Sequence, residues 1–180
     1  NIQKLPSGTF LELNLSNNQH EIKTYWAAID HLNQTQNARY SKEEATNQIR
    51  EKLEASVHSQ LMSDVPVGIC LSGGIDSSAI TAFASQHYPG KLKTFSVDFD
   101  FMRGGSELPL ANFVASTFKT DHQTFQISGN HIEETVRESI HWHDEPFGDS
   151  ANLPLFLIME KLKQQGIKVI LQGDGVDEQF

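Results

Sequence analysis

The stretch "VGICLSGGIDSS", residues 67–78, joins a short apolar run to a loop of glycine, serine and aspartate. The apolar half predicts a buried strand, and "SSAITAFASQHY" (77–88) predicts a helix directly after the loop. Such a connection is a common phosphate cradle, because loop N–H groups and the N-terminus of the following helix both favour anions. The loop has no lysine, and it matches neither G-x-x-x-x-G-K-[ST] nor G-x-G-x-x-G.

The chain beyond this loop alternates between strand and helix patterns. Strands are predicted at 93–99, 122–127 and 168–172, with helices at 106–118, 131–143 and 153–166 between them. Alternation of this kind predicts an α/β fold, with a parallel sheet and helices on both faces. The carboxyl ends of parallel strands share one rim, where ligands bind, so the sequences that end these strands become candidate site segments.

Residues 1–26 predict a β-hairpin instead. "TFLELNL" (9–15) alternates apolar and polar residues, "SNNQ" is a turn signal, and "EIKTYW" (21–26) is a return strand. A lone hairpin is marginal in water, so we expect it to belong to a larger sheet. Polar residues 27–40 predict a linker, and Ser41 with Glu44 forms a capping-box pattern that begins a helix ending near Ser63. Its apolar stripe is Ala45, Ile49, Leu53, Val57 and Leu61.

Composition limits the classes of partner. The 180 residues carry a formal net charge of −9, which argues against nucleic-acid and anionic-membrane partners. The single cysteine, Cys70, permits no intramolecular disulfide and is expected to be a small buried side chain. No signal peptide and no apolar run near the roughly 18 residues of a membrane span is visible, so we expect a cytoplasmic protein. Asn1 and Phe180 both indicate a piece of a longer polypeptide.

The loop chemistry points to a metal-bound polyphosphate. Gly73 and Gly74 would let backbone N–H groups approach an anion, and the serines of the loop would add hydroxyl donors. Asp76 fits beside an anion only if a cation such as Mg²⁺ lies between them. The segment "GDGVDE" (173–178) brings further carboxylates to the same rim, where they would repel one another without a cation.

Three separated motifs carry a family resemblance. "SGGIDSS" resembles the pyrophosphate-binding loop of PP-loop ATP pyrophosphatases. "LMSDVPVGICLSGGIDSS" (61–78), "DEPFGDSANLPLFL" (144–157) and "VILQGDGVDEQF" (169–180) resemble the synthetase domain of glutamine-dependent asparagine synthetases. The opening segment resembles the last strands of that family's N-terminal glutaminase domain, of the Ntn type. The resemblance implies a glutaminase-like tail at 1–26, a linker at 27–40 and a PP-loop ATP-binding domain at 41–180, truncated at its C-terminus.

The resemblance also implies a fold of the adenine nucleotide alpha hydrolase type and an amide-forming ligase. Mg-ATP would activate a carboxylate, classically the aspartate side chain, as an acyl-adenylate with release of pyrophosphate. Ammonia from glutamine would then attack to give asparagine and AMP. The expected partners are these small molecules and the rest of the same polypeptide, and the resemblance allows a homodimer.

Site residues follow by motif position. The resemblance assigns the pyrophosphate loop to Ser72, Gly73, Gly74, Asp76, Ser77 and Ser78, and the adenosine pocket to Leu71, Val97, Gln172 and Gly173. It assigns Mg²⁺ to Asp76 and Asp177. Asp174, a second catalytic carboxylate with Asp76, would lie near the reacting phosphate or amine, and Asp144 near the acceptor substrate.

One departure keeps alternatives open. The usual family pattern is S-G-E-G-x-D-E, whereas this chain reads "QGDGVDE", so Asp174 is one methylene shorter than the usual glutamate. The same adenylation chemistry could serve another acceptor carboxylate, as in β-lactam synthetases and lasso-peptide cyclases. A third interpretation is a catalytically inactive interaction module.

Overall fold

The computed structural model describes residues 2–30, 40–100, 106–143, 148 and 152–175, and the chain divides into two compact units, Asn1–Thr46 and Asn47–Phe180. In the first unit, β1 (Thr9–Asn14) pairs antiparallel with β2 (Gln19–Thr24), which confirms the predicted hairpin. Leu11 lies opposite Ile22 on one face of the hairpin, and both side chains are about half exposed. On the other face, Lys23 forms an ion pair with Glu12.

Helix α2 (Lys42–Gln60) begins with the predicted capping box. The Ser41 hydroxyl oxygen accepts from the Glu44 N–H at 3.2 Å, and the Glu44 carboxylate accepts from the Ser41 N–H at 2.8 Å. The predicted stripe is only partly correct. Val57 is 5% exposed, whereas Ile49 is 40% exposed, because the packed part of the stripe begins near Leu53.

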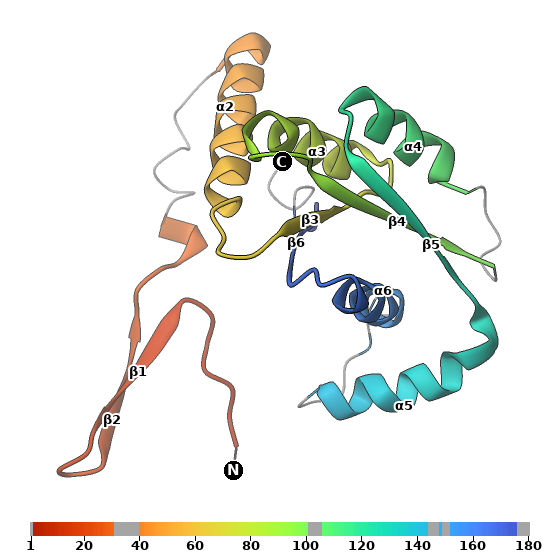
Figure 1. Ribbon diagram of the computed structural model, residues 1–180. Helices are drawn as coiled ribbons and strands as arrows, with labels where there is room; N and C mark the ends of the chain where they lie inside the picture. Colours follow the sequence, from red (N-terminus) through yellow and green to blue (C-terminus); the bar gives the residue numbers. More distant parts are fainter. Residues whose placement is uncertain (1, 31–39, 101–105, 144–147, 149–151, 176–180) are drawn as a thin grey trace. The chain divides into compact units, whose positions relative to one another are not determined.

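The second unit contains the predicted α/β sheet. Strands β3 (Val67–Cys70), β4 (Lys93–Phe99), β5 (Asp121–Ile127) and β6 (Val169–Leu171) pair in parallel in the order β5-β4-β3-β6 (Figure 1). Strand β3 therefore has a neighbour on each side. The helices that connect the strands are α3 (Ile75–His87), α4 (Leu108–Thr117), α5 (Ile132–Trp142) and α6 (Asn152–Gln164), with a 3-10 turn at Gly129–His131.

Helices cover both faces of this sheet, as predicted. On one face, Val67 and Ile69 of β3 pack with Ile80 and Ala84 of α3 and with Val57 of α2. On the other face, Phe95 of β4 packs with Leu162 and Ile158 of α6 (Figure 1). Successive side chains of a strand point to opposite faces of the sheet, so Ile69 points toward α3 and Phe95, opposite Cys70, points toward α6. Among the described residues, no helix is both long and apolar enough to cross a membrane.

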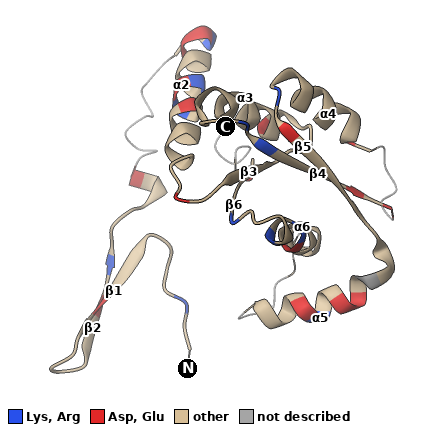
Figure 2. Ribbon diagram, in the orientation of Figure 1, with Lys and Arg blue, Asp and Glu red and all other residues tan. Residues whose placement is uncertain are grey.

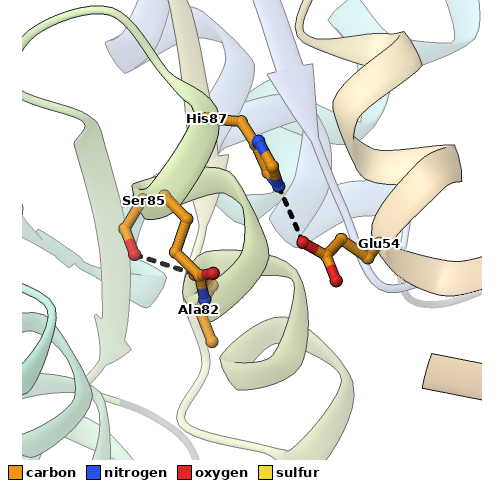
Figure 3. Close-up of polar contacts among 5 residues, drawn as sticks. Glu54, Ala82, Ser85 and His87 are labelled. Atoms are coloured by element: carbon orange, nitrogen blue, oxygen red, sulfur yellow. Dashed lines mark hydrogen bonds and ion pairs between the residues drawn. The ribbon is translucent and has the colours of Figure 1, made fainter. Parts of the chain in front are cut away.

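Polar contacts supplement the apolar packing between α2 and α3. Nε2 of His87, in the last turn of α3, lies 2.9 Å from the Glu54 carboxylate of α2 (Figure 3). The His58 and His87 rings lie 4.8 Å apart between their centroids. On α3 itself, the Ser85 hydroxyl donates to the Ala82 carbonyl at 2.8 Å (Figure 3). Both partners of the His87–Glu54 pair are partly exposed, so it contributes little to stability compared with the buried apolar cluster.

Candidate nucleotide site

The loop after β3 is built by its own serines. The Ser77 hydroxyl lies 3.0 Å from the Ser72 hydroxyl, 3.3 Å from the Ser72 N–H and 3.3 Å from the Gly74 carbonyl. The Gly74 N–H donates to the Ser72 hydroxyl at 3.3 Å, and Gly74 is the N-cap residue of α3. These contacts hold the loop in place at the N-terminus of α3, where an anion is favoured.

Gly73 is required by its backbone and by its neighbours. Its φ is +87°, and a Cβ there would lie 2.8 Å from both the Ala111 nitrogen and the Leu110 Cβ, which belong to the first turns of α4. The loop therefore lies directly against the start of a second helix. No side chain fits between them.

The loop after β6 meets the first loop at Asp76. A Cβ on Gly173 would lie 2.9 Å from the Asp76 Cβ and 3.2 Å from the Ser77 nitrogen. Because β3 and β6 are parallel neighbours, with Ile69 opposite Leu171, their carboxyl ends bring the two loops together. The sequence predicted this meeting of distant segments.

A cavity of about 390 Å³ lies at this rim. The predicted site residues that line it are Leu71, Ser72, Gly74, Asp76, Ser77, Val97, Gln172, Gly173 and Asp174. Gly73 and Ser78 do not line it. Gly73 instead lies against the start of α4, and the Ser78 N–H donates to the Gly74 carbonyl at 3.1 Å. Asp144 and Asp177 lie outside the described residues.

Other lining residues were not predicted from the sequence. They come from β4, from the start of α4 and from α6, together with Cys70 of β3. They are Phe95, Ser96, Phe99, Glu107, Leu108, Pro154, Leu155 and Ile158. Glu107 and Leu108 follow the second strand of the sheet, so the rule that ligands bind at strand ends could have found them. The α6 residues do not follow a strand end. Pro154 and Leu155 belong to the motif quoted at 144–157, which could have found them, but their place at the cavity depends on how the helix packs.

Charge at the cavity is entirely acidic among its described lining residues. These include the carboxylates of Asp76, Glu107 and Asp174 but no lysine or arginine. By contrast, helices α2 and α6 each carry residues of both signs (Figure 2). The pKa of the Cys70 thiol is raised to about 11, first by burial and second by the negative charge of Asp174. Cys70 is thus a protonated, poorly nucleophilic thiol at neutral pH.

The donor set fits a magnesium-bound phosphate better than a bare phosphate. Backbone N–H groups and hydroxyls from the first loop can hold phosphate oxygens, while Asp76 and Asp174 need a cation beside an anion. In the described part of the chain, no three His, Cys, Asp or Glu residues group closely enough to hold a metal ion by themselves. A Mg²⁺ ion held by one or two carboxylates and by phosphate oxygens needs no such group.

The chain is similar to known proteins over most of its length. The family model described as asparagine synthase matches residues 48–180. The chain is 38% identical to asparagine synthetase [glutamine-hydrolyzing] 1 of Bacillus subtilis, over 88% of this chain and 24% of that protein. It is 30% identical to amidase chyE of Penicillium rubens, over 91% of this chain and 26% of that protein.

A similar solved structure is the NH3-dependent NAD synthetase of Campylobacter jejuni, with a TM-score of 0.44 and 16% identity, covering 67% of this chain and 51% of that one. The chain spans about a quarter of the length of the curated relatives it matches.

The family model covers most of the chain, including the β3 loop and the β6 loop that meet at the cavity. The chain therefore belongs to the asparagine synthase family.

Proposed function

We propose that this chain carries the ATP-binding part of a ligase that activates a carboxylate, with the aspartate side chain as the acceptor, and forms an amide with ammonia from glutamine. The observation that carries the proposal is that Ser72, Ser77, Asp76 and Asp174 line one cavity. Membership of the asparagine synthase family supports the same interpretation. The hairpin at 1–26 would then be the tail of a glutaminase-like domain, and the linker at 27–40 would join it to the synthetase domain. The rest of the polypeptide would complete the site. The enzyme would work in the cytoplasm.

Each group has a defined task in this reaction. The backbone N–H groups of Ser72, Gly74 and Ser77, with the hydroxyls of the two serines, hold the β- and γ-phosphates, which leave as pyrophosphate. The acceptor carboxylate attacks the α-phosphorus, and ammonia then displaces AMP from the acyl-adenylate. Mg²⁺, bound by Asp76 with Asp177, would neutralise the phosphate charge. Asp174 lies at the rim where the incoming amine would arrive, and it can accept a proton from that amine.

The test measures binding and the first half-reaction separately. Titration of the full-length protein with Mg-ATP, beside Asp76→Ala, should show a loss of affinity of at least about tenfold, or about 1.4 kcal/mol, in the variant. Exchange of labelled pyrophosphate into ATP should then depend on aspartate. Absence of Mg-ATP binding by the folded protein would contradict the proposal.

A second acceptor is favoured by two observations. A relative of similar identity and coverage is named an amidase, not an asparagine synthetase, and Asp174 is shorter than the usual glutamate. The same exchange assay with a panel of other carboxylates would separate the two candidates. If exchange occurs only with a carboxylate other than aspartate, the proposed adenylation chemistry stands and the proposed acceptor is replaced.

A further inference from the structure

Ser96 of β4 has a buried hydroxyl that contacts the chain where the loop after β3 begins. Ser96 is 3% exposed, and its hydroxyl donates to the Leu71 carbonyl. Leu71 stands between Cys70, the last residue of β3, and Ser72, the first residue of the loop. The Leu71 N–H donates in turn to the Phe95 carbonyl of β4 at 2.7 Å. Both backbone polar groups of Leu71 are therefore bonded to β4, the carbonyl through a side chain.

The Ser96 hydroxyl extends the contact between β3 and β4 past the end of the shorter strand. The paired positions run as far as Cys70 opposite Phe95, so the next two positions, Leu71 and Ser96, also face each other. Leu71 is buried and packs with Ala111 of α4, so its carbonyl needs a donor from the protein. Without the Ser96 hydroxyl, this carbonyl would turn toward another donor and would move the start of the loop with it.

The loop and β4 line different parts of the same cavity. Val97 and Phe99, one and three residues after Ser96, form an apolar wall that we name the β4 wall. The loop contributes polar groups to the lining, among them Ser72 and Ser77. The serine hydrogen bonds within the loop fix its own shape. The bond from Ser96 instead fixes where the loop begins relative to the β4 wall.

We propose that Ser96 is a positioning residue that sets the distance between the loop after β3 and the β4 wall, so that one nucleotide contacts both. This inference rests on the proposed function, since it requires a ligand with a phosphate end and an apolar ring. Two groups joined in one ligand bind more tightly than either alone only if the protein presents both contact surfaces at the matching distance. A misplacement of about 1 Å is enough to lose much of this gain. Ser96 acts through the loop and needs no contact with the nucleotide.

The experiment compares a whole ligand with its two parts. Mg-ATP, Mg-pyrophosphate and adenosine are each titrated into the full-length protein. In Ser96→Ala the affinity for Mg-ATP should fall by at least about tenfold, whereas the affinities for Mg-pyrophosphate and adenosine should each change by less than about twofold. Ser139→Ala is the matched control, because Ser139 of α5 is also buried and its hydroxyl donates to the Val136 carbonyl at 2.9 Å. All three affinities should stay unchanged in this control.

The outcomes separate this inference from the proposed function. Absence of Mg-ATP binding by the folded natural protein would overturn the proposed function together with the inference. An unchanged Mg-ATP affinity in Ser96→Ala would overturn the inference and leave nucleotide binding intact. An equal loss for all three ligands would also overturn it, because that pattern indicates a loosened fold and not a changed distance. If Ser96→Ala does not fold by circular dichroism, Ser96→Cys replaces it, since a thiol fills similar space but is a weak donor, and the same pattern is expected.

Discussion

Single residues decide whether the first loop can hold phosphate. At Gly73 two constraints coincide, because the positive φ disfavours a side chain and the start of α4 leaves no room for one. At Ser77 one hydroxyl contacts both Ser72 and Gly74, and the Ser72 hydroxyl accepts from the Gly74 N–H, so two serine oxygens set the loop geometry. Gly90 has a comparable φ of +98°, but a Cβ there would meet no atom within 4 Å, which makes Gly90 a matched control.

Gly73→Ala should therefore be more damaging than Gly90→Ala. Backbone strain alone costs about 1 kcal/mol in each variant. In Gly73→Ala the new methyl group also displaces α4 from the loop, so Mg-ATP affinity should fall by at least about tenfold. Urea unfolding measures the stability of both variants, and titration measures their affinity. Equal stability and equal affinity in the two variants would contradict the role given to the loop–α4 contact.

At the scale of elements, the pairing of β4 with β5 half-buries a titratable group, His122, away from the site. Nδ1 of His122 lies 2.9 Å from the Thr94 hydroxyl, and Thr94 lies 2.7 Å from the Thr120 hydroxyl. Nε2 of His122 is buried without a partner among the described atoms. Burial lowers the pKa of His122 below its usual 6.5, against a smaller opposing effect of a hydrogen bond to the Thr94 backbone.

The sign of the resulting pH effect follows from linkage. Well above a pH of about 6.5, His122 is neutral in both the folded and the unfolded chain, so it carries no penalty. As the pH falls below that value, the unfolded chain takes up the proton first, and stability declines until the folded pKa is reached. His122→Asn should therefore reduce the loss of unfolding free energy between about pH 7.5 and about pH 5.5.

His141→Asn is the control for this measurement, since His141 is exposed on α5. Urea midpoints at the two pH values should change with pH as in the natural protein for His141→Asn, and less for His122→Asn. The same pH dependence in all three proteins would show that the burial of His122 has no energetic consequence.

At the scale of the whole molecule, charge should decide how the nucleotide binds. The chain has a formal net charge of −9, and the described lining of the cavity has no cationic side chain. With a chelator present, ATP should bind weakly. This residual binding should strengthen as salt rises from about 0.01 M to about 1 M, which shortens the Debye length from roughly 30 Å to roughly 3 Å. Uncharged adenosine should show little change. Weaker binding of free ATP at high salt would contradict this, because it would require a protein cation at the phosphates.

Much of this architecture could be predicted because it is locally encoded. The Ser41–Glu44 capping box and the strand–loop–helix at 67–88 depend on neighbours in sequence, and both formed as expected. The exposure of Ile49 could not be predicted, since periodicity does not say where packing partners end. The α6 wall of the cavity was missed for a similar reason. Its residues reach the site through helix packing and not through a strand end.

The position of β3 between β4 and β6 has a consequence for the tempo of binding. Val67, Ile69 and Leu71 are almost completely buried, and backbone amides in such a central strand are the last to exchange with solvent deuterium. The loop that we propose to hold phosphate follows directly after this strand, whose amides we expect to exchange slowly. The loop is therefore expected to be ordered before the nucleotide arrives. Diffusion, and not ordering of the loop, should then set the association rate.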